Sequence, residues 1–174
     1  MSYLMTTSHS CGPDALCFVL KDRDRNEIYS LMNWFNTCDW RDNMKDYIGS
    51  HFKVLDHFEI PHKLIDFKDF KNCKHPIICL LHNYPAKIPS WINAILYQHW
   101  VVVERVDNKN VFFHDGSGRI ACYDIETFQE WFYNGSPNCA YVVGEGELNI
   151  NRLEKFWDTL VTYFIKAYNF IFGE

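Results

Sequence analysis

Residues 97–115 read YQHWVVVERV, DNKN and VFFHD in succession, and they carry the strongest structural signal in the chain. The β-branched run over 97–106 is typical of a β-strand. The polar residues 107–110 suit a tight turn, and residues 111–115 form an apolar return strand. We therefore expect an antiparallel hairpin, in which the start of the first strand lies beside the end of the second.

Two polar residues fall at that shared edge of the hairpin. His99 stands at the start of the first strand, and Asp115 stands at the end of the second. Antiparallel neighbours bring them side by side, as an imidazole and its orienting carboxylate require. A single strand histidine or a single aspartate before a glycine is more often an ordinary surface or turn residue. The pairing of His99 with Asp115, and not either residue alone, predicts a histidine base that is oriented by a carboxylate.

Further strands flank the hairpin. The run PIICLLH over 76–82 is almost wholly apolar, which predicts a central strand buried on both faces. The remaining elements expected on this side of the chain are short strands at 62–66, 119–123 and 139–144, a helical turn at 66–71, and a helix capped by Asp124 that runs to Tyr133.

Apolar residues at helical spacing dominate the first third of the chain. They predict helices over 12–21, 27–35 and 42–58, with a break near 39–42. Helices followed by an antiparallel run of strands imply an α+β fold, with N-terminal helices packed on a sheet.

The segment SCGPDAL over residues 10–16 places Cys11 at the start of the first helix. Pro13 is tolerated in a first helical turn, and the charge of Asp14 complements the positive end of the helix dipole. That dipole stabilises a thiolate over a thiol, and the thiolate is the nucleophilic form. Taken alone, Cys11 is better explained as a buried packing residue. The pair of His99 and Asp115 reverses that preference.

Three motifs resemble, in this order, the Cys, His and Asp motifs of the double-glycine-leader (bacteriocin-processing) peptidases, which belong to the papain-like cysteine peptidases. The motifs are SCGPDAL at 10–16, HWVVV at 99–103 and VFFHDG at 111–116. The resemblance covers roughly residues 5–144. It implies a papain-like fold in which Cys11 is the nucleophile, His99 is the general base and acid, and Asp115 orients His99.

The resemblance also implies an oxyanion site upstream of Cys11. The family usually carries a glutamine about six residues before the cysteine, where this chain has Met5. A thioether cannot donate a hydrogen bond, and loss of one such donor costs roughly a hundred- to a thousandfold in rate. We expect the backbone N–H of Cys11 to serve as one donor, and a second to come from Thr6, Thr7, Ser8 or His9.

Composition narrows the classes of protein. A length of 174 residues suits one domain, and a formal net charge of -5 without a Lys/Arg cluster argues against a nucleic-acid partner. The seven cysteines are an odd number, and the first residues lack the pattern of a secretory signal, so we expect reduced thiols in the cytoplasm. No Cys-x-x-Cys pair is present, and we expect neither a metal nor a cofactor.

Residues 149–174 carry apolar side chains at three- and four-residue intervals, which predicts an amphipathic helix. We expect a peptidase domain over 1–146 and a C-terminal helical extension over 147–174. Charges interrupt the apolar stripe, so it is not a membrane span. Its partner stays open between its own domain, a second copy or partner protein, and a membrane surface with which the chain would associate peripherally.

The function expected from these features is that of a thiol peptidase, which cleaves a peptide or protein substrate through a thioester acyl-enzyme. One alternative is a non-catalytic papain-like module for peptide binding or assembly, which Met5 favours. Another is an amidase of the same chemistry that acts on cell-wall peptides or glutamine side chains. The fold alone does not separate these substrates.

Overall fold

The computed structural model describes residues 11–38, 47–82, 98–115, 120–133 and 139–146, together with Leu160 and Tyr163. The helical segments are α1 (Cys11–Val19), α2 (Arg25–Cys38), α3 (Tyr47–His57), the 3-10 helix η1 (Phe67–Asn72) and α5 (Ile125–Tyr133). The strands are β1 (His62–Leu64), β2 (Ile77–His82), β3 (Gln98–Val106), β4 (Asn110–His114), β5 (Ile120–Asp124) and β6 (Ala140–Val143). The predicted α+β class is confirmed.

The strands form one antiparallel sheet in the order β1-β6-β2-β3-β4-β5. The predicted hairpin is β3 and β4, in which Val102 lies opposite His114 and Val106 lies opposite Val111. Strand β6 comes last in the sequence but lies between β1 and β2. The last strand in the sequence therefore joins the first strand, at one edge of the sheet, to the central strand β2.

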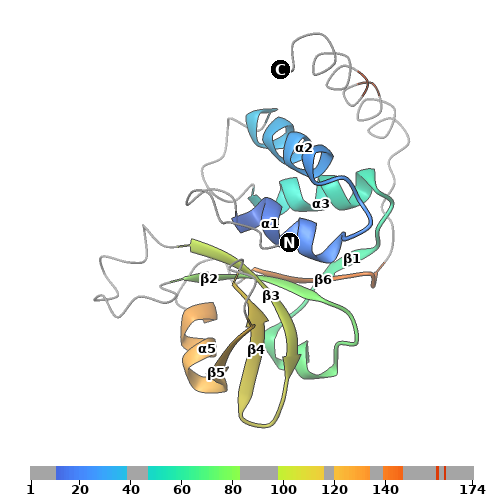
Figure 1. The fold of residues 1–174 in the computed structure, drawn as a ribbon. Helices are drawn as coiled ribbons and strands as arrows, with labels where there is room; N and C mark the ends of the chain where they lie inside the picture. Colours follow the sequence, from blue (N-terminus) through green and yellow to red (C-terminus); the bar gives the residue numbers. More distant parts are fainter. Residues whose placement is uncertain are drawn as a thin grey trace.

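Helices cover both faces of the sheet, as Figure 1 shows. Helices α1, α2 and α3 lie on one face, and α5 lies on the other with η1. Strand β2 separates two cores, since Ile78 and Leu80 join the first, and Ile77, Cys79 and Leu81 join the second. Every residue of β2 is buried, which confirms the prediction of a strand covered on both faces.

Helix α1 lies directly across β3. Its buried residues Ala15 and Leu16 share a core with Trp100 and Val102 of that strand. Apolar burial of this kind is the main force that fixes one element on another. It holds the first turn of α1, which begins at Cys11, above the start of the hairpin.

Asp124 ends β5 and caps α5, as its position in the sequence predicts. Its Oδ1 accepts a hydrogen bond from the backbone N–H of Thr127 at 2.8 Å, and its Oδ2 accepts one from the Thr127 hydroxyl at 2.8 Å. Such a side chain satisfies an N–H group that the first turn of a helix leaves unpaired. The chain thus passes from strand to helix, and Phe128 and Phe132 reach the second core.

Most predicted segments agree with the structure and differ only at their ends. Of the helix predicted over 42–58, the described part is α3, and residues 42–46 lie outside the described residues. The predicted extension over 147–174 also lies outside them, apart from Leu160 and Tyr163, which are both helical. Within the described parts of the chain, no helix combines the length and the apolar character that crossing a membrane needs.

Candidate active site

The imidazole of His99 meets Asp115 at the open end of the β3–β4 hairpin. Nε2 of His99 donates a hydrogen bond to the backbone carbonyl oxygen of Asp115 at 2.8 Å. A carbonyl oxygen only accepts, so this bond places the ring proton on Nε2 and leaves Nδ1 as the basic nitrogen. The sequence predicts a contact with the carboxylate, whereas this bond runs to the main chain.

Opposing effects set the charge of His99. Burial lowers its pKa below the usual 6.5, while the hydrogen bond to the Asp115 backbone and the charge of the Asp115 carboxylate both act to raise it. Burial dominates because removal of water disfavours the charged imidazolium. The ring is therefore neutral at pH 7, in the form that accepts a proton.

Cys11 is half-buried at the first position of α1. Its sulfur receives hydrogen bonds from the backbone N–H groups of Trp100 and Gly12, and from its own. Trp100 follows His99 directly on β3. The sulfur of the candidate nucleophile thus lies beside the backbone of Trp100, the residue that directly follows the candidate base on β3.

The charge state of Cys11 differs from the prediction. Burial raises its pKa above 9.0, and the hydrogen bonds from the backbone lower it by less than burial raises it. The nearby carboxylate of Asp14 raises the pKa further. The helix dipole predicts a thiolate, but desolvation disfavours that charge and outweighs the dipole. In this structure the resting sulfur is a protonated thiol at pH 7.

Cys11 and His99 approach β3 from different faces. Trp100 and Val102 pack toward α1, whereas Val101 packs toward α5. Side chains alternate along a strand, so His99 shares the face of Val101. The His99 ring bonds to the Asp115 carbonyl, and the Cys11 sulfur receives its bonds from the backbone N–H groups of Trp100 and Gly12 and from its own. The structure brings His99 and Asp115 into contact and brings Cys11 to the neighbouring backbone.

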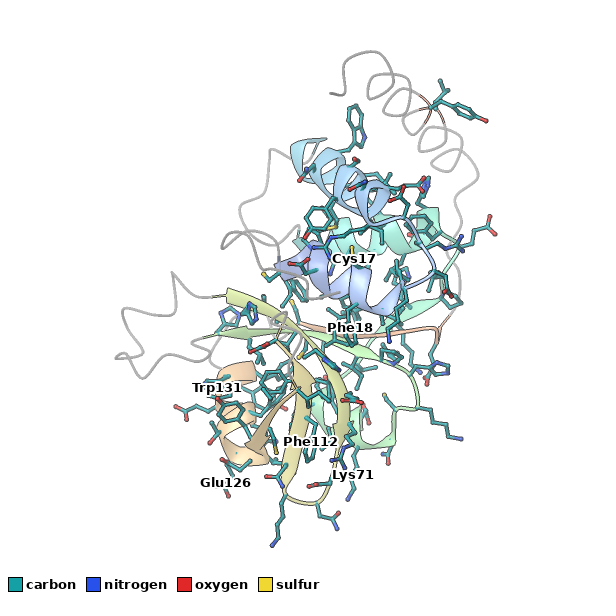
Figure 2. The ribbon with its side chains drawn as sticks, in the orientation of Figure 1. Cys17, Phe18, Lys71, Phe112, Glu126 and Trp131 are labelled. Atoms are coloured by element: carbon teal, nitrogen blue, oxygen red, sulfur yellow. The ribbon has the colours of Figure 1, made fainter. Side chains whose placement is uncertain are left out.

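A groove of about 400 Å³ opens beside Cys11, between α1 and the hairpin. Residues 11, 14, 15 and 18 form one helical stripe along its α1 wall. Trp100 and Val102 of β3, with His114 of β4, form the opposite wall. The ring of Phe18 packs against that of His114 with 4.1 Å between centroids, and Figure 2 shows Phe18 on the side of α1 that faces the sheet.

A polar cluster fixes α1 against α2 near this groove. Asp14 accepts a hydrogen bond from Arg25 at 2.6 Å and one from the hydroxyl of Tyr29 at 2.5 Å. Burial, together with the hydrogen bond to Asp14 and its charge, raises the pKa of Tyr29 to about 12. Asp14 therefore links the two helices, a role that its place in the sequence, three residues after Cys11, does not reveal.

The predicted oxyanion donors lie outside the described residues, and the described residues contain no cluster of metal ligands. Met5 and the predicted oxyanion donors Thr7 and His9 lie outside the described residues, as do Thr6 and Ser8. Within the described ranges, no group of three or more His, Cys, Asp or Glu side chains is arranged to hold a metal ion.

A larger hollow of about 590 Å³ lies beside β1 and η1, with Asp66, Asp69 and Cys73 on its walls. It lies in the half of the sheet away from β3 and β4, so we centre the site on Cys11.

Two residues of the site escape sequence reasoning. Trp100 contributes through its backbone N–H, which a side-chain motif cannot show, although its position after His99 is the available signal. Arg25 reaches Asp14 from the next helix, and no spacing rule predicts that contact. No protein-family model matches the chain, and no curated protein matches it. The candidate site accordingly rests on the geometry of its own residues.

Proposed function

We propose that the chain is a thiol amide hydrolase of the papain-like class, a peptidase in the first instance, with Cys11 as nucleophile and His99 as base. The observation that supports this most is the pair of backbone contacts at the start of β3. His99 is held by the carbonyl of Asp115 at 2.8 Å, and the next N–H along the strand, that of Trp100, reaches the Cys11 sulfur. A nucleophile, a base and a group that orients the base are the three parts such chemistry requires.

In the proposed reaction, Nδ1 of His99 takes the proton from the Cys11 sulfur as the sulfur attacks an amide carbonyl carbon. The S–C bond forms, and the C–N bond breaks as the imidazolium returns that proton to the leaving amine. Water then attacks the thioester carbon while His99 takes its proton; the C–O bond forms, the C–S bond breaks, the imidazolium returns the proton to the Cys11 sulfur, and the acid product leaves. The Asp115 carbonyl keeps the proton on Nε2, so that Nδ1 is the nitrogen that exchanges protons.

The resting arrangement requires one movement before this chemistry. Proton transfer needs Nδ1 and the sulfur within about 3.2 Å, and catalytic contacts are often longer before substrate binds. His99 is the second residue of β3, and its ring is largely buried on the face opposite Cys11, so rotation of the side chain alone does not bring it to the sulfur. We propose that the edge of the hairpin that carries both His99 and Asp115 twists toward Cys11, in the free protein as well as with substrate in the groove, so that the bond to the Asp115 carbonyl is kept.

The test measures alkylation of each cysteine by iodoacetamide at pH 7, by mass spectrometry of the resulting peptides. Cys11 should react at least about tenfold faster in the wild-type chain than in His99→Ala, because general-base assistance is worth roughly a hundredfold or more. Cys17 is the matched control, since it lines the same groove and burial raises its pKa to about 11. Its rate should be the same in both chains. Equal rates for Cys11 in the two chains would rule the hydrolase out.

A second candidate is a non-catalytic module that binds peptide in the same groove. The raised pKa of Cys11 favours this alternative, because a protonated thiol is a poor nucleophile. This module would bind peptides without cleaving them, and His99→Ala would leave the alkylation of Cys11 unchanged. An amidase of the same chemistry would share the behaviour of the hydrolase and differ only in its substrate.

A further inference from the structure

The groove beside Cys11 combines apolar walls with a basic end. Its walls carry Phe18, Trp100 and Val102, and among the described residues its lining includes Lys21, Arg23 and Arg25 but one carboxylate, that of Asp14. The chain as a whole has a formal net charge of -5, so this local excess of positive charge runs against the average. Clefts lined by one sign of charge attract ligands of the other sign.

The positive charges of the groove are not all neutralised within the structure. Arg25 forms an ion pair with Asp14 at 2.6 Å. Lys21 and Arg23 instead lie over aromatic rings, with Lys21 4.9 Å from the centre of Phe18 and Arg23 5.2 Å from the centre of Phe58. A cation on a ring keeps its charge and stays near the apolar wall. Of the described lining residues, Lys21 and Arg23 are thus the charges presented to a ligand.

We propose that this groove binds an acidic peptide segment, with an apolar side chain against Phe18 and carboxylates beside Lys21 and Arg23. The inference rests on the proposed function in one respect, which is that the bound peptide presents its cleaved bond to Cys11. A helix rises about 1.5 Å per residue, so α1 runs roughly 12 Å from Cys11 to Val19, and Lys21 follows in the turn just beyond its end. An extended peptide rises about 3.3 Å per residue, which puts the carboxylates roughly four or five residues from the bond at Cys11.

The test uses fluorescence anisotropy of three eight-residue peptides that carry a dye without net charge. The peptides alternate leucine with glutamate, glutamine or lysine. The protein is the full chain with Cys11→Ala, so that no peptide is cleaved during the measurement. An exposed charge pair is worth between about 1.4-fold and fivefold in affinity. We expect the glutamate peptide to bind roughly tenfold more tightly than the glutamine peptide at 20 mM salt, and the lysine peptide to bind most weakly.

Variants of the two basic residues locate the effect. Lys21→Gln and Arg23→Gln should each weaken the glutamate peptide between about 1.4-fold and fivefold. Lys109→Gln is the matched control, since Lys109 is exposed in the turn between β3 and β4 and should change nothing. Reversal of both charges, Lys21→Glu with Arg23→Glu, should transfer the preference to the lysine peptide. Salt at 300 mM should remove most of the preference, because the screening length falls from about 20 Å to about 6 Å.

Three results would overturn the proposal. They are equal binding of the glutamate and glutamine peptides, an effect of Lys109→Gln as large as that of Lys21→Gln, and tighter binding of an eight-nucleotide oligo-dT than of the glutamate peptide. The last result would make the groove a nucleic-acid site. Failure of the proposed hydrolase is a separate outcome. In that case the glutamate peptide binds as expected, while alkylation of Cys11 in the chain that retains it does not depend on His99.

Discussion

Acid should destabilise this protein through His51, which is fully buried beside the candidate site. Its Nδ1 shares a hydrogen bond of 2.5 Å with the hydroxyl of Tyr141, and its ring packs on Trp100 with 4.5 Å between centroids. Burial lowers the pKa of His51 from 6.5 to about 3. Between pH 6.5 and pH 3, the unfolded chain therefore binds a proton at His51, whereas the folded chain does not. The stability that results is fully present above pH 6.5 and is lost as the pH falls toward 3.

The size of the effect follows from the pKa difference. A pH of 4.5 is two units below the pKa of 6.5 that His51 has in the unfolded chain, and each unit is worth about 1.36 kcal/mol. His51 alone should therefore lower the free energy of unfolding by about 2.7 kcal/mol relative to pH 7.5. The comparison chain is the double variant His51→Phe with Tyr141→Phe, which removes both hydrogen-bonding partners and leaves neither unsatisfied. Between the two pH values it should lose about 2.7 kcal/mol less than the wild type.

Urea unfolding followed by tryptophan fluorescence, at pH 7.5 and pH 4.5, measures both losses. Other histidines with pKa values lowered by burial, such as His82 and His99, contribute equally to the two chains and cancel in the difference. Phe52→Leu is the control, since Phe52 also packs on Tyr141 but does not titrate. It should lower the stability equally at both pH values. If the wild type and the double variant lose the same free energy, burial of His51 is not the source of acid sensitivity.

Three further predictions follow from single features of the structure. The part of the Cys11 alkylation rate that depends on His99 should be constant between pH 7 and 8.5 and fall with a midpoint below 6.5, because burial lowers the pKa of His99; a midpoint above 7 would contradict this. Asp124→Ala should lower the urea midpoint more than Asp124→Asn, which keeps an oxygen acceptor for α5. Gly146→Ala should cost about 1–3 kcal/mol in urea unfolding, since Gly146 has a φ of +122° and a Cβ there would lie 2.6 Å from the carbonyl oxygen of His62; an unchanged midpoint would show that the backbone yields.

The hairpin and its edge residues could be predicted because they are set by local rules. Alternation and turn composition fix which end of β3 meets which end of β4, so His99 and Asp115 follow from the sequence without any distant contact. Strand β2 could be predicted equally well, because an unbroken apolar run of this length is stable mainly in the interior of a sheet that is covered on both faces. The cap of α5 depends on residues only three positions apart.

The charge state of Cys11 could not be predicted in this way. The helix dipole is a property of the first turn of α1 and is visible in the sequence. The desolvation that overrides it depends on packing of α1 across β3, and Trp100 lies far along the chain from Cys11. The partner of Asp14 was hidden for the same reason, since Arg25 comes from a second helix whose placement depends on the whole core. A local sequence pattern indicates the helix dipole at Cys11, but the desolvation of its sulfur depends on tertiary packing.

The position of β6 has a consequence for how the chain is made. Strand β6 pairs on one side with β1 and on the other with β2, yet it leaves the ribosome after every other strand of the sheet. Until Ala140–Val143 emerge, one edge of β2 has no partner although both of its faces are apolar. An unpaired apolar strand edge is a template for aggregation. Nascent chains that stall before Ala140 should therefore depend on chaperones, and a break in translation there should be far more damaging than one placed after Val143.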